Sequence, residues 1–105
     1  MGFSAAHFLL THEKCSRLHG HNYKVRVAVR GETDENGMVI DFHALMQRVL
    51  AICKEIDHKV IVPGKSSRIE TIAGEGEIKI LLPDREYILP LDDITILPIH
   101  ASTAE

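Results

Sequence analysis

The sequence of 105 residues contains no tryptophan, and its Phe and Tyr residues together amount to 5% of the chain. Aliphatic side chains must therefore supply most of any hydrophobic core. Basic residues are not in excess either, because 12 Lys and Arg stand against 15 Asp and Glu and give a formal net charge of −3. This balance argues against a surface that binds nucleic acids or anionic membranes.

Long hydrophobic runs are also missing. No segment approaches the roughly 18 apolar residues of a membrane span, and no signal-peptide pattern opens the chain. The two cysteines are too few for a disulfide framework, and in a reducing compartment such cysteines more often serve catalysis or metal binding. We therefore expect one small cytoplasmic domain, residues 1–105, with neither a membrane nor a nucleic acid as partner.

The apolar pattern predicts a mixture of strands and one helix. Short apolar or alternating segments predict strands at residues 3–10, 21–30, 77–82, 86–89 and 92–99. Asp41 is a predicted helix N-cap, because its carboxylate can accept hydrogen bonds from the free amides of a first turn. Behind it a stripe of i, i+3, i+4, i+7 spacing comprises Phe42, Leu45, Met46, Val49, Leu50, Cys53 and Ile56. We expect this stripe to be buried against a sheet.

The most informative stretch is CSRLHGHNY, residues 15–23. His19 and His21 are two positions apart in the register of a predicted strand, which separates them by about 6.5–7 Å and lets both rings lean onto one metal ion. His7 shares the apolar face of the other predicted strand and can supply a third ligand. Three histidines with an open fourth position are typical of catalytic zinc, whereas structural zinc sites are closed by four ligands. The alternative is ordinary surface and core histidines.

Cys15 has several interpretations. It can be a fourth metal ligand, or a free thiol that the nearby dication holds as thiolate, so that it acts as base or nucleophile. An inert loop cysteine is the remaining alternative, and Cys53, in the apolar stripe, is expected to serve packing. Asp57 and His58, just after the predicted helix, are a second acid–base candidate, although the helix dipole alone also favours a histidine there.

Four segments together resemble the 6-pyruvoyltetrahydropterin synthase / 6-carboxytetrahydropterin synthase family, namely FSAAH, CSRLHGHNY, GMVIDF and EIDHK, between Phe3 and Lys59. The resemblance implies an α+β T-fold, in which an antiparallel sheet carries a pair of helices across one face. It further implies a homo-oligomer, a hexamer in the family, and a zinc-dependent lyase that acts on 7,8-dihydroneopterin triphosphate.

The resemblance also implies a role for each candidate residue. These roles are Zn²⁺ binding by His7, His19 and His21, proton transfer at the pterin side chain by Cys15, and proton relay by Asp57 and His58. The four-residue spacing between Cys15 and His19 resembles the spacing in the 6-carboxytetrahydropterin synthases of queuosine and archaeosine synthesis. The pyruvoyl branch, which usually has a longer gap, is the alternative product class. A non-catalytic zinc- or pterin-binding module and a structural Cys-His₃ zinc domain are two further alternatives.

The C-terminal part departs from the family pattern. Residues 60–101 match poorly, and the resemblance resumes only at STAE, which fits the S-x-x-E capping box that opens a helix. The family anchors the pterin ring through a glutamate in its last strand, whereas Glu105 matches the helix start instead. We therefore expect the chain to lack the second long helix and the final two strands.

Overall fold

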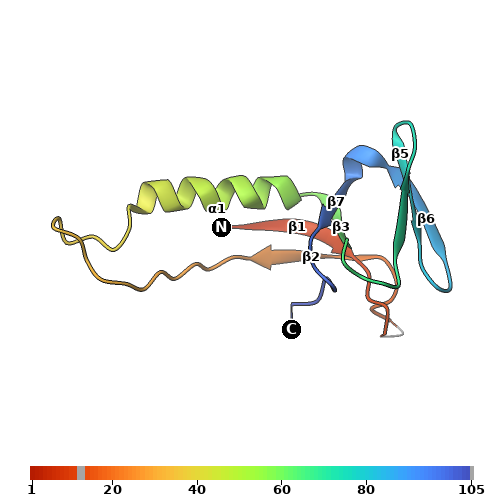
Figure 1. Cartoon of the computed structure of the whole chain (residues 1–105), viewed down its shortest axis with the longest axis horizontal. Helices are drawn as coiled ribbons and strands as arrows, with labels where there is room; N and C mark the ends of the chain where they lie inside the picture. Colours follow the sequence, from red (N-terminus) through yellow and green to blue (C-terminus); the bar gives the residue numbers. More distant parts are fainter. Residues whose placement is uncertain (12–13, 105) are drawn as a thin grey trace.

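The structure is a computed structural model that describes residues 1–11 and 14–104. Its elements in chain order are β1 (Gly2–His7), β2 (His19–Lys24), α1 (Phe42–Ile56), β3 (Lys59–Pro63), β4 (Glu70–Ala73), β5 (Glu77–Leu81), β6 (Glu86–Pro90), the 3₁₀ turn η1 (Leu91–Asp93) and β7 (Ile94–Leu97). The α+β class is confirmed, since α1 lies along a sheet (Figure 1). Within the described residues, every helix is too short or too polar to cross a lipid bilayer.

The strands form two sheets, one of order β2-β1-β3-β7 and one of order β4-β5-β6. β1 and β2 are antiparallel, as is the whole second sheet. The expectation of a purely antiparallel sheet is wrong for the other two pairs, because β1–β3 and β3–β7 are parallel. The reason is the path of the chain: α1 runs in the direction of β1, and β3 continues from its end after only two residues (Figure 1).

Both N-terminal strands are shorter than predicted. β2 ends at Lys24 rather than at residue 30, because β1 begins at Gly2 and the two residues pair there. Beyond this point a hydrogen bond from Val25 N to Met1 O, 3.0 Å long, continues the ladder. The following segment runs on as an extended chain that pairs with no strand in the described part of the chain (Figure 1).

The helix starts as predicted but is not buried as predicted. The Asp41 carboxylate accepts hydrogen bonds from the backbone N–H groups of His43 and Ala44, at 2.8 and 3.4 Å. Of the expected buried stripe, however, only Cys53 is buried, and Phe42 is 82% exposed. The first turns of α1 extend beyond the start of β1, so the sheet covers only the C-terminal part of the helix (Figure 1).

The core joins the two sheets at the end of β1. Its buried members come from the residue after β1 and from β3, β5 and β7, and they are Phe8, Val62, Ile78, Ile80 and Ile94. Phe8 stacks on Tyr87 of β6, with ring centroids 5.5 Å apart. The β5–β6 hairpin is therefore packed beside the loop that connects β1 to β2.

The expected helix start at the C-terminus is absent from the described residues. Residues 101–104 have no regular structure, and Glu105 lies outside the described part of the chain. The Ser102 hydroxyl does not cap a helix here but donates a hydrogen bond of 3.3 Å to the carbonyl of Phe8. This contact places the last described segment against the end of β1.

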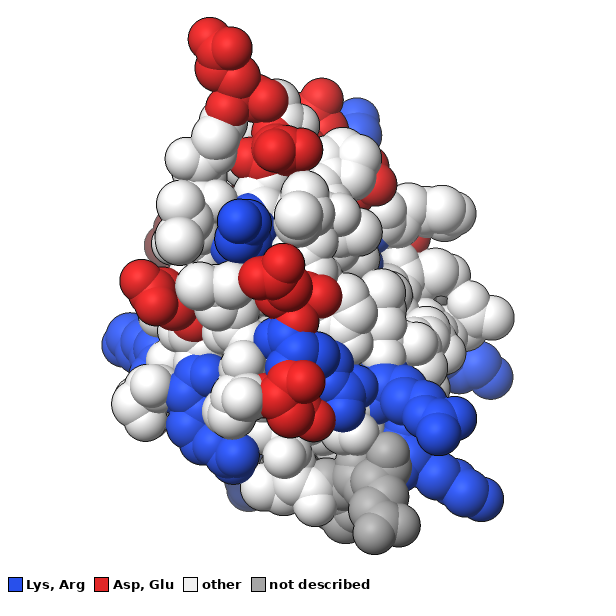
Figure 2. Space-filling view, turned by 90° about the vertical axis from the view of Figure 1, so that its right-hand side faces the viewer, with Lys and Arg blue, Asp and Glu red and all other residues white. Residues whose placement is uncertain are grey.

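Charge is distributed unevenly over the face that carries the second sheet. In Figure 2 most Lys and Arg side chains of this face lie in its lower half, and most Asp and Glu side chains lie in its upper half. The lower half corresponds to the end of the molecule at which the β1–β2 loop lies in Figure 1. An anion that approaches this end therefore meets a favourable field.

Candidate metal centre

Three histidines from two paired strands converge on one point. The antiparallel register sets His7 directly opposite His19, and it sets His21 opposite Ala5, two residues along the same face. The ring centroids of the three histidines lie 4.6 to 5.0 Å apart. One nitrogen from each ring lies within 4.8 Å of those of the other two. The structure thus brings together the three residues that the strand pattern predicted.

Hydrogen bonds orient two of these rings for metal binding. The Nδ1–H of His7 donates to the backbone carbonyl of Ser102 at 2.8 Å, and that of His19 donates to the carbonyl of Arg17 at 2.6 Å. A proton on Nδ1 leaves Nε2 with a free lone pair, as metal-binding histidines require. In residues 1–11 and 14–104, His7 Nε2 is the only buried side-chain nitrogen or oxygen without a hydrogen-bond partner. Since such an atom is costly to bury unsatisfied, these residues fit a divalent cation such as zinc.

The lowered pKa of His7 also favours the neutral imidazole, which can bind a metal ion. Burial lowers this pKa from its ordinary value of 6.5, and the neighbouring His19 and His21 lower it further, against an opposing hydrogen bond to Ser102. The imidazole of His7 is therefore neutral at neutral pH, which is the protonation state that binds metal.

The lowered pKa predicts that the metal-free protein loses stability on acidification. Between the lowered pKa of folded His7 and the ordinary value near 6.5, the unfolded chain binds the proton and the folded chain does not, so the free energy of unfolding decreases as pH falls through this window. Urea unfolding in the presence of chelator, at pH 7.5 and at about pH 5.5, measures the effect. We expect His7→Gln to flatten this pH dependence and His43→Gln, on the exposed side of α1, to retain it. Equal slopes in wild type and His7→Gln would contradict the assignment.

Cys15 lines the same pocket as the three histidines. This pocket has a volume of about 390 Å³, and Leu9 and Tyr23 form part of its wall. A hydrogen bond of 2.8 Å from Leu9 N to the carbonyl of Cys15 fixes the loop to the end of β1. Cys15 is half-buried and forms no disulfide. Among the described residues the converging ligand atoms do not include its sulfur, which favours a free thiol beside the three histidines over a fourth ligand.

Asp57 and His58 connect α1 to β3 and contact β1 at Ser4. The Asp57 carboxylate accepts a hydrogen bond from Ser4 N at 2.8 Å and pairs with His58 Nδ1 at 2.9 Å. The hydrogen bond from Ser4 and that from His58 lower the pKa of Asp57. His58 has a φ of 59°, an uncommon left-handed conformation for a residue other than glycine. Neither residue lines the pocket of Cys15, and His58 lines a different pocket, which adjoins that of Cys15 at His21 and Asn22. Within one chain, the structure does not bring this pair to Cys15.

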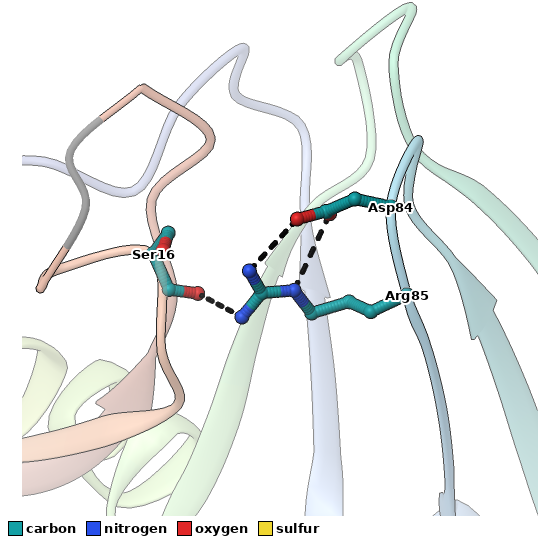
Figure 3. Close-up of polar contacts among 3 residues, drawn as sticks. All are labelled: Ser16, Asp84 and Arg85. Atoms are coloured by element: carbon teal, nitrogen blue, oxygen red, sulfur yellow. Dashed lines mark hydrogen bonds and ion pairs between the residues drawn. The ribbon is translucent and has the colours of Figure 1, made fainter.

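Arg85, which contacts the loop of Cys15, was not predicted from the sequence. Its Nη1 donates to the carbonyl of Ser16 at 3.2 Å, and its Nη2 and Nε bind the Asp84 carboxylate at 2.9 and 3.3 Å (Figure 3). The β5–β6 hairpin therefore supports the cysteine loop. The segment PDR, residues 83–85, predicted only a turn. Its contact with the cysteine loop could not be predicted, because that contact depends on the tertiary packing of the hairpin.

We expect Arg85→Gln to loosen this loop. Loss of the guanidinium contact exposes Cys15 more often, so its alkylation rate should rise a few-fold, as for other locally opening segments. Mass spectrometry after timed alkylation measures each cysteine separately, and buried Cys53 is the internal control. Arg48→Gln, an exposed charge change on α1, should leave both rates unchanged. A Cys15 rate in Arg85→Gln equal to that of wild type would refute a supporting role.

The whole chain, and not only the histidine cluster, is similar to known proteins. The profile of the family described as 6-pyruvoyl tetrahydropterin synthase matches residues 1–105. The chain belongs to this family. Its structure resembles that of Plasmodium falciparum 6-pyruvoyl tetrahydropterin synthase with a TM-score of 0.86 at 38% identity, covering 99% of this chain and 64% of that one. The predicted T-fold is thereby confirmed.

Two archaeal relatives in the family bear a more specific name. Proteins of Pyrococcus abyssi and Methanocaldococcus jannaschii, both provisionally named 6-carboxy-5,6,7,8-tetrahydropterin synthase, are 41% and 35% identical over 105 and 104 residues. Each alignment covers 98% of this chain, but only 62% of the first relative and 64% of the second. The chain thus spans under two thirds of the length of these relatives.

Proposed function

We propose that the chain carries the site of a zinc-dependent lyase that converts 7,8-dihydroneopterin triphosphate to 6-carboxy-5,6,7,8-tetrahydropterin. The observation that supports this most is the convergence of His7, His19 and His21 beneath a pocket that Cys15 also lines. The names of the archaeal relatives favour the carboxy product. The name of the Plasmodium structure favours the pyruvoyl product, which is the alternative.

In this proposal the three histidines hold zinc, which as a Lewis acid would polarise the oxygens of the pterin side chain. The carbonyls of Ser102 and Arg17 keep the protons of two of these rings on Nδ1 and so direct Nε2 to the ion. Cys15, on the wall of the same pocket, accepts the proton that the side-chain carbon loses. Leu9 and Tyr23 supply apolar surface to the wall of the same pocket.

Asp57 and His58 are assigned the proton relay by family resemblance. The contact between the Asp57 carboxylate and His58 Nδ1, 2.9 Å long, holds the His58 ring, and imidazole is a common proton carrier in proteins. Because the pair does not line the pocket of Cys15 in one chain, a role beside this cysteine requires the pair of a second copy. The proposal therefore includes a homo-oligomer, a hexamer by family resemblance.

The surface of the chain supports association. Large apolar side chains are exposed along α1 and along the segment before it, including Val27, Val29, Met38, Val39, Ile40, Phe42, Met46, Leu50 and Ile52. So many exposed apolar side chains on one helix and the segment before it favour contact with other protein.

A turnover assay tests the proposed function. Zinc-loaded protein is incubated with 7,8-dihydroneopterin triphosphate, and both triphosphate and the pterin product are quantified by chromatography and mass spectrometry. Because the carboxy product keeps only one of the three side-chain carbons, the proposal predicts uptake of one water and equal amounts of triphosphate, 6-carboxytetrahydropterin and a two-carbon aldehyde, and no product from His19→Ala. A 6-pyruvoyl product would assign the other branch. Zinc-loaded protein that binds the substrate and leaves it unchanged would instead be a non-catalytic module.

A further inference from the structure

A second pocket adjoins the pocket of the metal centre. It has a volume of about 410 Å³ and lies between the end of β1, the segment after β3 and the last described residues. Leu9 and Thr103 line both pockets, so the two share a wall. The inner lining is apolar and includes Phe8, which is 2% exposed. Charges at the opening are therefore screened less than on an open surface.

The charged residues that line this second pocket are all basic. Lys65 and Arg68 are exposed at its opening, and no Asp or Glu is among its lining residues. Neither cation forms an ion pair with another residue in the described ranges 1–11 and 14–104. Two positive charges thus face one cavity that Ser66 and Ser67 also line, and Arg68 in addition helps Arg85 to lower the pKa of the neighbouring Asp84. This combination of donors suits an anion with several oxygens.

The segment that carries these side chains is held in place. Lys65 N donates to the carbonyl of Ile99 at 3.0 Å, and His100 Nδ1 donates to the carbonyl of Lys65 at 3.1 Å. A side chain at Gly64 would place its Cβ 2.7 Å from Cγ2 of Ile96, so glycine lets this turn pack against β7. The basic side chains therefore project from a fixed backbone and not from a loose loop.

We propose that this second pocket binds the phosphate chain of an organic polyphosphate, with Lys65 and Arg68 as its cationic ligands and Ser66 and Ser67 as hydroxyl donors. The inference rests on the proposed function, whose substrate carries a triphosphate at the end of a three-carbon side chain. With that side chain at the histidines, the shared wall at Leu9 and Thr103 puts the triphosphate next to the basic opening. The uneven charge of the neighbouring face (Figure 2) would attract the same anion.

Titration calorimetry with inorganic tripolyphosphate tests this inference on metal-free protein, so that the phosphates cannot bind through zinc. We expect Lys65→Gln and Arg68→Gln each to weaken tripolyphosphate binding by about tenfold, since each removes one charged contact. Arg48→Gln, the same charge change on the exposed side of α1, should bind as wild type. Orthophosphate should bind at least about tenfold more weakly than tripolyphosphate, because it reaches only one of the two cations.

The outcomes separate this inference from the proposed function. Wild-type affinity in both Lys65→Gln and Arg68→Gln, or an equal loss in Arg48→Gln, would overturn the phosphate pocket even if the protein turns over the pterin substrate. Selective loss in the two pocket variants would support the pocket even if no turnover is found, and would then direct the search to a different polyphosphate.

Discussion

Replacing His19 or His21 with alanine is expected to remove stoichiometric zinc from the protein. Loss of a hydrogen-bonding partner of a metal ligand typically costs 10- to 100-fold in metal affinity, so loss of a ligand itself should cost more than about 100-fold. The remaining pair of histidines cannot hold the ion, because zinc sites use three or four protein ligands. Metal analysis of purified, dialysed protein measures the zinc content per chain.

His43→Ala is the matched control for this experiment. His43 is exposed on α1, and its ring does not belong to the converging set, so its loss should leave one zinc per chain. His19 and His21 are less buried than His7, so we expect the two variants to fold, and circular dichroism checks this. Wild-type zinc content in both ligand variants would show that the metal binds elsewhere.

Cys15→Ala is expected to retain zinc and to lose turnover by about 10²- to 10⁴-fold, the usual contribution of a general acid or base. The reason is geometric: the thiol lines the pocket, but its sulfur is outside the converging ligand atoms. Metal analysis and the triphosphate-release assay measure the two properties on the same sample. Cys53→Ala removes the other thiol, which is buried in α1, and should retain both properties. Loss of zinc from Cys15→Ala would instead support a closed site of four ligands.

The histidine cluster was predictable because it depends on local alternation and one strand pairing. Side chains two apart share a strand face, so His19 and His21 had to lie together once β2 formed. The pairing that sets His7 opposite His19 then follows from an antiparallel connection between neighbouring strands. The start of α1 was predictable for a similar reason, because the capping side chain of Asp41 lies only two or three residues from its donors.

Contacts between distant segments were not predictable in the same way. Ser102 orients His7 from 95 residues away, and Arg85 reaches Ser16 across 69 residues. β3 was missed because a five-residue apolar run just after a helix has no distinctive periodicity. β4 was missed because its four residues are all exposed and show no alternation. The prediction that the apolar stripe of α1 is buried was wrong. An apolar pattern indicates which face of a helix is suited to burial, but it does not indicate how far the sheet extends along the helix.

X-ray absorption at the zinc edge of the zinc-loaded protein tests the three-histidine site without requiring turnover, because it identifies and counts the ligands of the ion. We predict three imidazole nitrogens at about 2.0–2.1 Å and one further oxygen ligand, with no sulfur in the coordination shell. This result would establish a three-histidine site with an open position beside a free Cys15. A zinc–sulfur distance of about 2.3 Å, or a shell with fewer than three imidazoles, would contradict the account.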